Sequence, residues 1–167
     1  MKKLYLIRHG KSNWDDDEIS DFDRPLKNRG VKNAYEMVER LKNKDINPEL
    51  ILSSPANRAL HTAVIFATQL NIDLSKLNIC DYLYEFSTLD ILKQITKIND
   101  KHESVMIFGH NPFITDLTNY LTGEFIENIP TAGIASIYFD LSSWQLITEN
   151  SGTLDFFDYP KRNKSEL

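Results

Sequence analysis

The sequence predicts an α/β domain, a three-layer sandwich with a largely parallel central sheet, helices on both faces and an antiparallel C-terminal hairpin. Strand-like and helix-like segments alternate along most of the chain, the pattern of parallel strands joined by helices. Two apolar runs, "LYLI" at residues 4–7 and "VMIF" at residues 105–108, each end beside a glycine and a histidine. Past Gly123 two strand-like segments follow one another, which favours a hairpin at the sheet edge.

The length and composition indicate one domain. A chain of 167 residues with 41% hydrophobic residues is large enough to bury a core of ordinary size. We find no repeat, linker or low-complexity tract that would divide it. The domain is therefore predicted to cover residues 1–158, and residues 159–167 are predicted to form a polar C-terminal tail.

The first half of the chain is predicted to contain two strands, each followed by a helix. The first strand covers about residues 3–7, and apolar residues at helical spacing predict a helix over about residues 27–44. The run "ELILSS" predicts the second strand. In the next helix Ser54 is predicted as the N-cap and Pro55 as the first helical residue. The predicted apolar face of this helix consists of Ala56, Ala59, Leu60, Ala63, Val64, Ala67 and Leu70.

The second half repeats this order before its character changes. A short strand is predicted around Ile79, and Ser87 with Asp90 forms a capping box that opens a helix. The strand "SVMIFG" then leads to a helix that starts at Asn111 and Pro112. The segments "GIASIYFD" and "WQLITEN", on either side of a Leu-Ser-Ser turn, are predicted to pair as the hairpin.

Charge and cysteine content exclude several classes of partner. A net charge of −5 is unfavourable for binding nucleic acid or an anionic membrane surface, since both need a broad basic face. Cys80 is the only cysteine, so no internal disulfide is possible. The apolar run after "MKK" is too short for a signal peptide, and no segment is long enough to span a membrane. We expect a cytoplasmic monomer.

Four features of the sequence are predicted to meet at one edge of the sheet. In open α/β sheets, ligands bind at the carboxyl ends of the strands, where helix N-termini present backbone N–H groups. Arg8 with His9, Arg58, His110 and the loop around Glu85 all fall at this edge.

The side chains at this edge suit a phosphoryl group. The guanidinium groups of Arg8 and Arg58 match phosphoryl oxygens. A positive pocket also disfavours imidazolium, so His9 is expected to stay neutral and able to attack phosphorus. Arginine clamps with one in-line nucleophile could supply most of the catalysis of phosphoryl transfer.

Three motifs resemble those of a known family. "LIRHG", "SSPANRALHTA" and "FGHNP" occur in the order and spacing of the histidine phosphatase superfamily, which has the phosphoglycerate mutase-like fold. The resemblance extends over nearly the whole chain. "RHGKSNWDD" followed by "DFDRPLKNRG" is similar to the small SixA-type phosphohistidine phosphatases.

The resemblance implies a role for each matching residue. His9 would be the nucleophile that becomes phosphorylated, and Arg8 and Arg58 would hold the phosphoryl oxygens. His110 would donate to the phosphoryl group and stabilise the transition state. Arg24 matches an arginine that reaches the phosphate in SixA-type members, although it could instead form a structural bridge with Asp21 or Asp23. The resemblance implies no metal and no cofactor.

Three further residues have two interpretations each. Glu85 matches the position of the proton donor in the wider superfamily, but the glycine-rich continuation usual in the mutases is missing. It could equally be a loop carboxylate without a chemical role. Ser12 and Asn13 could present donors to the phosphate, or could serve only the turn chemistry of the loop.

The leading hypothesis is a metal-independent phosphatase that dephosphorylates phosphohistidine on a protein, such as a histidine phosphotransfer domain. Lys11 stands where the mutases have glutamate or glutamine, and a span of only about 35 residues before the strand at 104–109 leaves little material for a lid. Two alternatives remain, a phosphatase of small phosphoesters such as sugar phosphates or nucleotides, and a non-catalytic phosphate-binding module.

Overall fold

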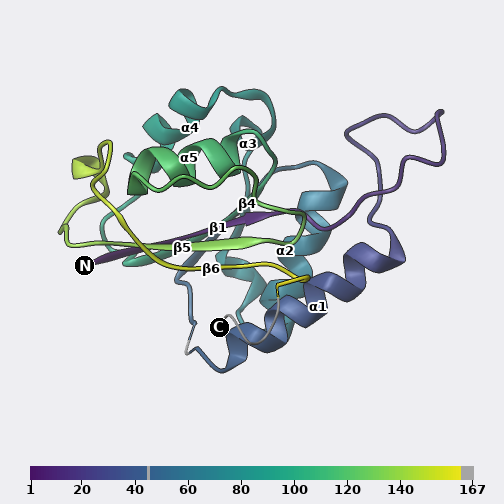
Figure 1. The fold of residues 1–167 in the computed structure, drawn as a ribbon, viewed down its shortest axis with the longest axis horizontal. Coiled ribbons are helices and arrows are strands. Elements are labelled where there is room, and N and C mark those ends of the chain that lie inside the picture. The colour runs from purple at the N-terminus through teal and green to yellow at the C-terminus, as the bar shows by residue number, and fades with distance from the viewer. Residues whose placement is uncertain (45, 163–167) are drawn as a thin grey trace.

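The computed structural model describes residues 1–44 and 46–162 and has three layers (Figure 1). The strands of the described residues are β1 Lys2–Arg8, β2 Leu50–Ser53, β3 Leu77–Ile79, β4 Ser104–Gly109, β5 Ile134–Phe139 and β6 Thr153–Asp158. The helices are α1 Asn28–Lys42, α2 Asn57–Gln69, α3 Tyr82–Glu85, α4 Thr88–Ile95 and α5 Phe113–Thr122, with 3₁₀ turns at Leu74–Lys76 and Trp144–Leu146. In Figure 1, α3, α4 and α5 cover one face of the sheet, while α1 and α2 cover the other.

The strands form a single sheet in the order β3-β2-β4-β1-β5-β6. The pairs β3–β2, β2–β4 and β4–β1 are parallel, whereas β5 runs antiparallel to β1 and β6 antiparallel to β5. This arrangement confirms the predicted fold class. It also places the carboxyl ends of β2, β4 and β1 side by side, and the residues that follow these strands form the candidate site.

Alternate residues of β1 are buried in two separate hydrophobic clusters, one on each face of the sheet. Leu4 and Leu6 pack in a cluster with residues of α4 and α5, whereas Tyr5 and Ile7 pack in one with residues of α1 and α2. This alternation follows from the two-residue period of a strand that is covered on both faces. The central strand is thus fixed between two cores, and its last residues are held rigidly.

Helices α1, α2, α4 and α5 occur where they were predicted, whereas the short helix α3 was not predicted and α2 begins later than expected. Ser87 is confirmed as the N-cap of α4, because its side chain accepts a hydrogen bond from the Asp90 amide. The Asp90 carboxylate accepts from the Ser87 hydroxyl rather than from the Ser87 amide, so only half of the predicted capping box forms. Ser54, however, is not the N-cap of α2, which begins at Asn57 with Ala56 as its N-cap. The chain turns through Pro55 before the helix starts, and this leaves the Ser54 hydroxyl available to His110.

The buried face of α2 also differs from the predicted one. Ala59, Ala63 and Ala67 are buried as expected, but Val64 is exposed and Phe66 is fully buried. The reason is that α2 packs against both the sheet and α1, so its buried surface includes the side of Phe66. Small alanines allow this close approach on two sides.

The C-terminal hairpin pairs different residues from those predicted. β5 pairs with β6 at the sheet edge, while residues 144–146 of the predicted second strand form a 3₁₀ turn. Trp144 is fully buried, and its indole N–H donates to the His102 carbonyl over 2.7 Å. Burial of this large side chain at the opposite end of the sheet fixes residues 144–146 outside the ladder.

The start of the predicted polar tail is attached to α1. The Arg40 guanidinium donates to the Tyr159 and Pro160 carbonyls, each over 3.1 Å, and forms an ion pair with Asp158 over 2.8 Å. The rest of the predicted tail, residues 163–167, lies outside the described residues. No helix within residues 1–44 and 46–162 has the length and apolar character needed to cross a membrane.

Candidate functional site

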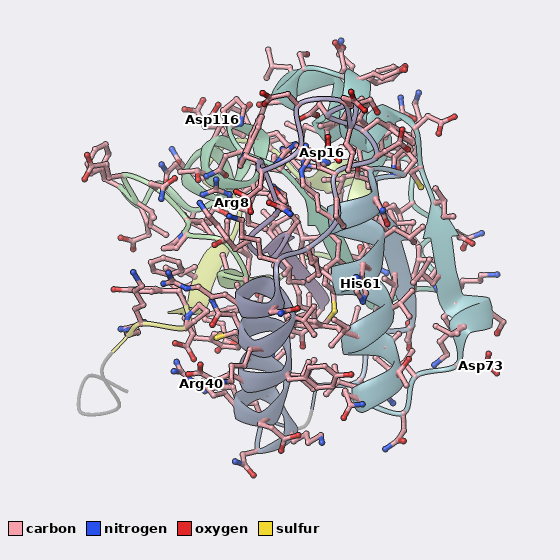
Figure 2. All side chains as sticks on the ribbon, turned by 90° about the vertical axis from the view of Figure 1, so that its right-hand side faces the viewer. Arg8, Asp16, Arg40, His61, Asp73 and Asp116 are labelled. Carbon is pink, nitrogen blue, oxygen red and sulfur yellow. The ribbon has the colours of Figure 1, made fainter. Side chains whose placement is uncertain are left out.

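The pairing of β1 with β4 brings His9 and His110 together at the edge predicted for the site. Arg8 is in register with Gly109, and the His9 amide donates to the Gly109 carbonyl over 3.0 Å. The centroids of the two imidazole rings lie 5.1 Å apart. Gly109 has to lack a side chain, because a Cβ there would stand 2.1 Å from the Phe113 ring. Figure 2 views the molecule from this side, with Arg8 labelled at the end of β1.

His9 is held in one orientation by its neighbours. It is only 8% exposed, and its Nδ1–H donates to the Gly10 carbonyl over 2.7 Å. The Gly10 amide donates in turn to the Thr62 hydroxyl of α2 over 3.0 Å. With the proton on Nδ1, Nε2 carries the lone pair of the neutral ring.

His110 contacts two side chains from other elements. Its Nε2 lies 2.7 Å from the Ser54 hydroxyl at the end of β2, and the Tyr84 ring packs against its own at 5.7 Å between centroids. Its Nδ1 is buried and has no hydrogen-bond partner among the described residues. Buried polar atoms without partners are rare and are tolerated mainly at functional sites.

Both histidines are neutral near pH 7. Burial lowers the pKa of His9 to about 3, with the positive charges of Arg58 and Arg8 adding to the effect of burial and the bond to Gly10 opposing it. Burial likewise lowers the pKa of His110 to about 4, with a further contribution from the charge of Arg58. These directions agree with the prediction of a neutral histidine in a positive pocket.

Asp21 accepts hydrogen bonds from the two buried arginines, Arg24 and Arg58, and from Tyr84. The Arg58 guanidinium donates to the Asp21 carbonyl over 2.6 Å and to its carboxylate over 3.1 Å. Arg24 donates to the same carboxylate through Nε at 3.1 Å and Nη2 at 2.9 Å, and the Tyr84 hydroxyl donates over 2.9 Å. Partial burial would raise the pKa of Asp21, but the bonds from Arg24 and Tyr84 and the charge of Arg58 lower it to about 2.

The remaining contacts of Arg24 fix the loop that follows β1. Arg24 is only 5% exposed and stacks on the Trp14 ring, with 3.4 Å between the guanidinium carbon and the ring centroid. It also donates to the Ser12 hydroxyl and to the Asn13 carbonyl. The Asn13 side chain accepts from the Asp15 amide, as in an Asx-turn. That Ser12 and Asn13 bind substrate stays a prediction.

Arg8 is half-buried and lies against the loop before β5. Its Nη1 donates to the Ile129 carbonyl over 2.9 Å and to the Asn128 side chain over 3.3 Å. The Ala132 amide lies near both the Arg8 and His9 carbonyls, at 3.1 and 3.0 Å. Residues 128–132 are therefore attached directly to the end of β1.

Glu85 is exposed at the end of α3 and, within the described part of the chain, makes no hydrogen bond or ring contact with either histidine. Its neighbour Tyr84 is the residue of this segment that contacts both His110 and Asp21. The proton-donor role of Glu85 stays a prediction. Tyr84 was not predicted from the sequence, because nothing in "LYEF" distinguishes its aromatic ring from those of the core.

Two other residues of the site make contacts that differ from those predicted from the sequence. Ser54 was expected to cap α2 but contacts His110, and Asp21 was expected at most to pair with Arg24 but contacts Arg58 as well. The signal for Asp21 is its spacing of three residues from Arg24. No group of three or more His, Cys, Asp or Glu side chains within residues 1–44 and 46–162 is arranged to hold a metal ion.

The buried neutral histidines predict that the free energy of unfolding decreases as the pH falls below about 6.5. An unfolded histidine titrates near pH 6.5, whereas the folded pKa values are about 3 and 4. The unfolded state therefore binds more protons in this window, so stability is present above pH 6.5 and is lost as the pH falls towards 4. We expect His9 to account for about 2 kcal/mol of the loss between pH 7 and pH 4.5.

Urea denaturation at the two pH values measures this loss. In His9→Gln the decrease in the free energy of unfolding between pH 7 and pH 4.5 should be smaller than in the wild type by about 2 kcal/mol, because one of the two buried imidazoles is gone. His61→Gln, at an exposed position of α2, should leave the loss unchanged. An equal loss in His9→Gln and the wild type would show that His9 does not stay neutral in the folded protein.

Comparison with known proteins gives the family. Residues 4–90, just over half of the chain, match the histidine phosphatase superfamily (branch 1). An uncharacterized protein of Mycobacterium leprae is 29% identical over 167 residues, which cover 93% of this chain and 100% of that protein.

Two solved structures resemble the whole fold. The protein histidine phosphatase SixA complexed with tungstate superposes with a TM-score of 0.80 at 26% identity, covering 95% of this chain and 97% of that one. A SixA protein from Agrobacterium tumefaciens gives a TM-score of 0.81 at 27% identity, covering 95% and 98%. The chain belongs to the histidine phosphatase superfamily, and within it to the SixA type.

Proposed function

We propose that this phosphatase works without a metal ion through a phosphohistidine intermediate on His9, and that its substrate is phosphohistidine on a protein. The observation that carries the first part is the state of His9, which is neutral, holds its proton on Nδ1 and packs against His110. A neutral imidazole with a defined tautomer is the form that can attack phosphorus.

The first step transfers the phosphoryl group to His9. The substrate ring takes up a proton from solvent on the nitrogen that does not carry the phosphoryl group. Nε2 of His9 attacks the phosphorus in line, a bond from Nε2 to phosphorus forms, and the bond from phosphorus to the substrate ring breaks with its electron pair, so the ring leaves as neutral imidazole. In the second step water attacks the same phosphorus, the bond to Nε2 breaks, and inorganic phosphate leaves. His9 returns to its neutral state with the proton still on Nδ1.

The cationic groups around His9 are suited to the charge of the transferring group. Arg8 and Arg58 flank the histidines closely enough to lower the pKa of His9, Arg24 adds a third positive charge, and the neutral His110 ring lies against His9. Charge in a loose transition state is spread over the equatorial oxygens, which guanidinium groups match. In this proposal these four side chains bind the phosphoryl oxygens.

Asp21 keeps the arginines in place for this role. A buried guanidinium without a partner would be costly, and the Asp21 carboxylate supplies a partner to both Arg24 and Arg58. Each guanidinium is thereby oriented before the substrate arrives, which lowers the reorganisation needed during the reaction. Asp21 is thus a positioning residue in the proposal.

The surroundings of the site support a protein substrate. Trp14 stacks on Arg24 and is 64% exposed, and Phe22 packs on Tyr84 and is 40% exposed. Exposed aromatic side chains beside a charged site are typical of surfaces that bind proteins. The segment between α2 and β4 contains only β3, a 3₁₀ turn and the short helices α3 and α4, so little chain is available to close over the site.

A phosphohistidine substrate also fits the exposure of Glu85. Imidazole leaves phosphorus readily, so a strong general acid is less necessary than for an alkoxide. If small phosphoesters were the substrate, protonation of the leaving oxygen would be required, and Glu85 would then be the proposed donor.

The nucleophile is tested by substitution and by trapping. His9→Ala should lose at least about 10³-fold in kcat for an aryl phosphate, as expected when a nucleophile is removed. An acid-labile, base-stable phosphoenzyme should form in the wild type and be absent from the variant. His61→Ala provides the matched control, and residual activity of His9→Ala close to the wild-type rate would contradict the assignment.

The substrate class is tested by comparing kcat/KM for a phosphohistidine protein with that for sugar phosphates, nucleotides and an aryl phosphate. We expect the phosphohistidine protein to be preferred, because it needs no strong general acid and can contact the exposed aromatic side chains. A higher kcat/KM for a small phosphoester would favour the small-molecule alternative.

The role of Asp21 is tested by Asp21→Asn. We expect kcat to fall about tenfold with a smaller change in KM, since the neutral amide no longer orients Arg58 and Arg24 by charge. Asp23→Asn, two residues away, is the control, because among the described side chains the Asp23 carboxylate accepts only from the Ser20 hydroxyl. An Asp21→Asn variant with raised activity would mean that the carboxylate competes with the phosphoryl group for the arginines.

A further inference from the structure

A second pocket with basic walls lies beside the candidate site. Its volume is about 340 Å³, and its lining includes Lys11, Arg29 and Lys161 but no acidic residue. These cations come from three different parts of the chain, the loop after β1, the first turn of α1 and the segment after β6. The pocket is not part of the proposed phosphoryl site, since none of the residues that surround His9 and His110 lines it.

The charges of this pocket are not compensated by the residues that the structure describes. Within residues 1–44 and 46–162, none of Lys11, Arg29 and Lys161 forms an ion pair, whereas Arg40 on the same helix as Arg29 pairs with both Glu36 and Asp158. A protein with a net charge of −5 thus concentrates three cations, none of them paired to a described residue, around one cavity. Such a cluster attracts anions over about 8 Å at physiological ionic strength.

The walls of the pocket are held by buried contacts. On one side Arg40 binds the Tyr159 and Pro160 carbonyls, and Figure 2 shows Arg40 at α1 near the C-terminal segment. On the other side the Lys11 backbone packs on Gly30 of α1 so closely that a Cβ there would stand 2.2 Å from the Lys11 carbonyl oxygen. The Lys27 amide also donates to that oxygen over 2.8 Å. The pocket is therefore a fixed feature of the surface.

The same walls connect the pocket to His9. Lys11 follows His9 by two residues, so their Cα atoms lie at most about 7 Å apart. Pro130 and Thr131 line the pocket, and the neighbouring residues Ile129 and Ala132 bond to Arg8 and to the end of β1. One substrate molecule can therefore occupy the phosphoryl site and this pocket at once.

We propose that this pocket binds a carboxylate side chain that flanks the phosphohistidine of the protein substrate. The proposal rests on the proposed function. Lys11, Arg29 and Lys161 are exposed, unlike the buried guanidinium groups of Arg24 and Arg58 at the phosphoryl site. Between them lie Pro130, Tyr159 and Pro160, whose apolar surfaces suit the methylene groups of a glutamate.

Two phosphohistidine peptides that differ only in their flanking residues, glutamate or glutamine, test this selectivity. For the wild type we expect kcat/KM to be about fivefold higher for the glutamate peptide than for the glutamine peptide, because two exposed charge pairs contribute on this scale. The difference should lie in KM. The double variant Arg29→Gln with Lys161→Gln should lose this preference and keep its rates on the glutamine peptide and on an aryl phosphate. Lys97→Gln with Lys101→Gln, before β4 at the opposite sheet edge, removes the same charge and should keep the preference.

The unphosphorylated glutamate peptide provides a second readout that is independent of catalysis. In NMR titrations it should shift the amide signals of Lys11, Arg29 and Thr131 in the wild type and not in the double variant. If neither phosphohistidine peptide is hydrolysed, the proposed function is rejected. The NMR titration would still show whether the pocket binds the glutamate side chain.

Three outcomes would overturn the pocket assignment. These are equal use of the two peptides by the wild type, a preference that survives in the Arg29→Gln, Lys161→Gln variant, and shifts caused by methylenebisphosphonate but not by the glutamate peptide. The last would identify a phosphate pocket instead.

Discussion

The site depends on the parallel pairing of β1 with β4. This register places Arg8 opposite Gly109. His9 and His110 directly follow these paired residues on neighbouring strands, and their rings lie 5.1 Å apart. Both strands are buried on both faces, and their backbone bonds cannot shift without moving two cores. The candidate nucleophile and its partner histidine are therefore positioned by two strands that are packed on both faces.

Electrostatics at this edge differ from those of the molecule as a whole. The protein carries a net charge of −5, yet Arg8, Arg24 and Arg58 surround two buried neutral histidines. Asp21 compensates the two most buried arginines from the rim of the site, because its carboxylate is half exposed while their guanidinium groups are not. Burial that keeps the histidines neutral also costs stability at low pH, so the property on which the proposed nucleophilic attack depends lowers the free energy of unfolding in acid.

Much of this organisation could be predicted from the sequence. The apolar runs that end at "RHG" and "FGH" identified the strands that carry His9 and His110, and Pro55 with the alanines after it identified the α2 region that carries Arg58. The rule that sites form at the carboxyl ends of parallel strands then placed these residues together. The contacts of Tyr84 and Ser54 with His110 could not be predicted, since each depends on which distant side chain packs against it.

The sequence by itself determined the alternation of strands and helices, the fold class and the residues at the ends of the strands, because local periodicity and turn chemistry encode these features. Only the tertiary structure decided the strand order with β4 between β2 and β1, the pairing of β5 with β6, the return of Asp21 onto Arg58, and the basic pocket. Each of these joins residues far apart in the chain, such as Asp21 with Arg58 and Lys11 with Lys161. Their contacts are set by the packing of whole layers, which no local pattern records.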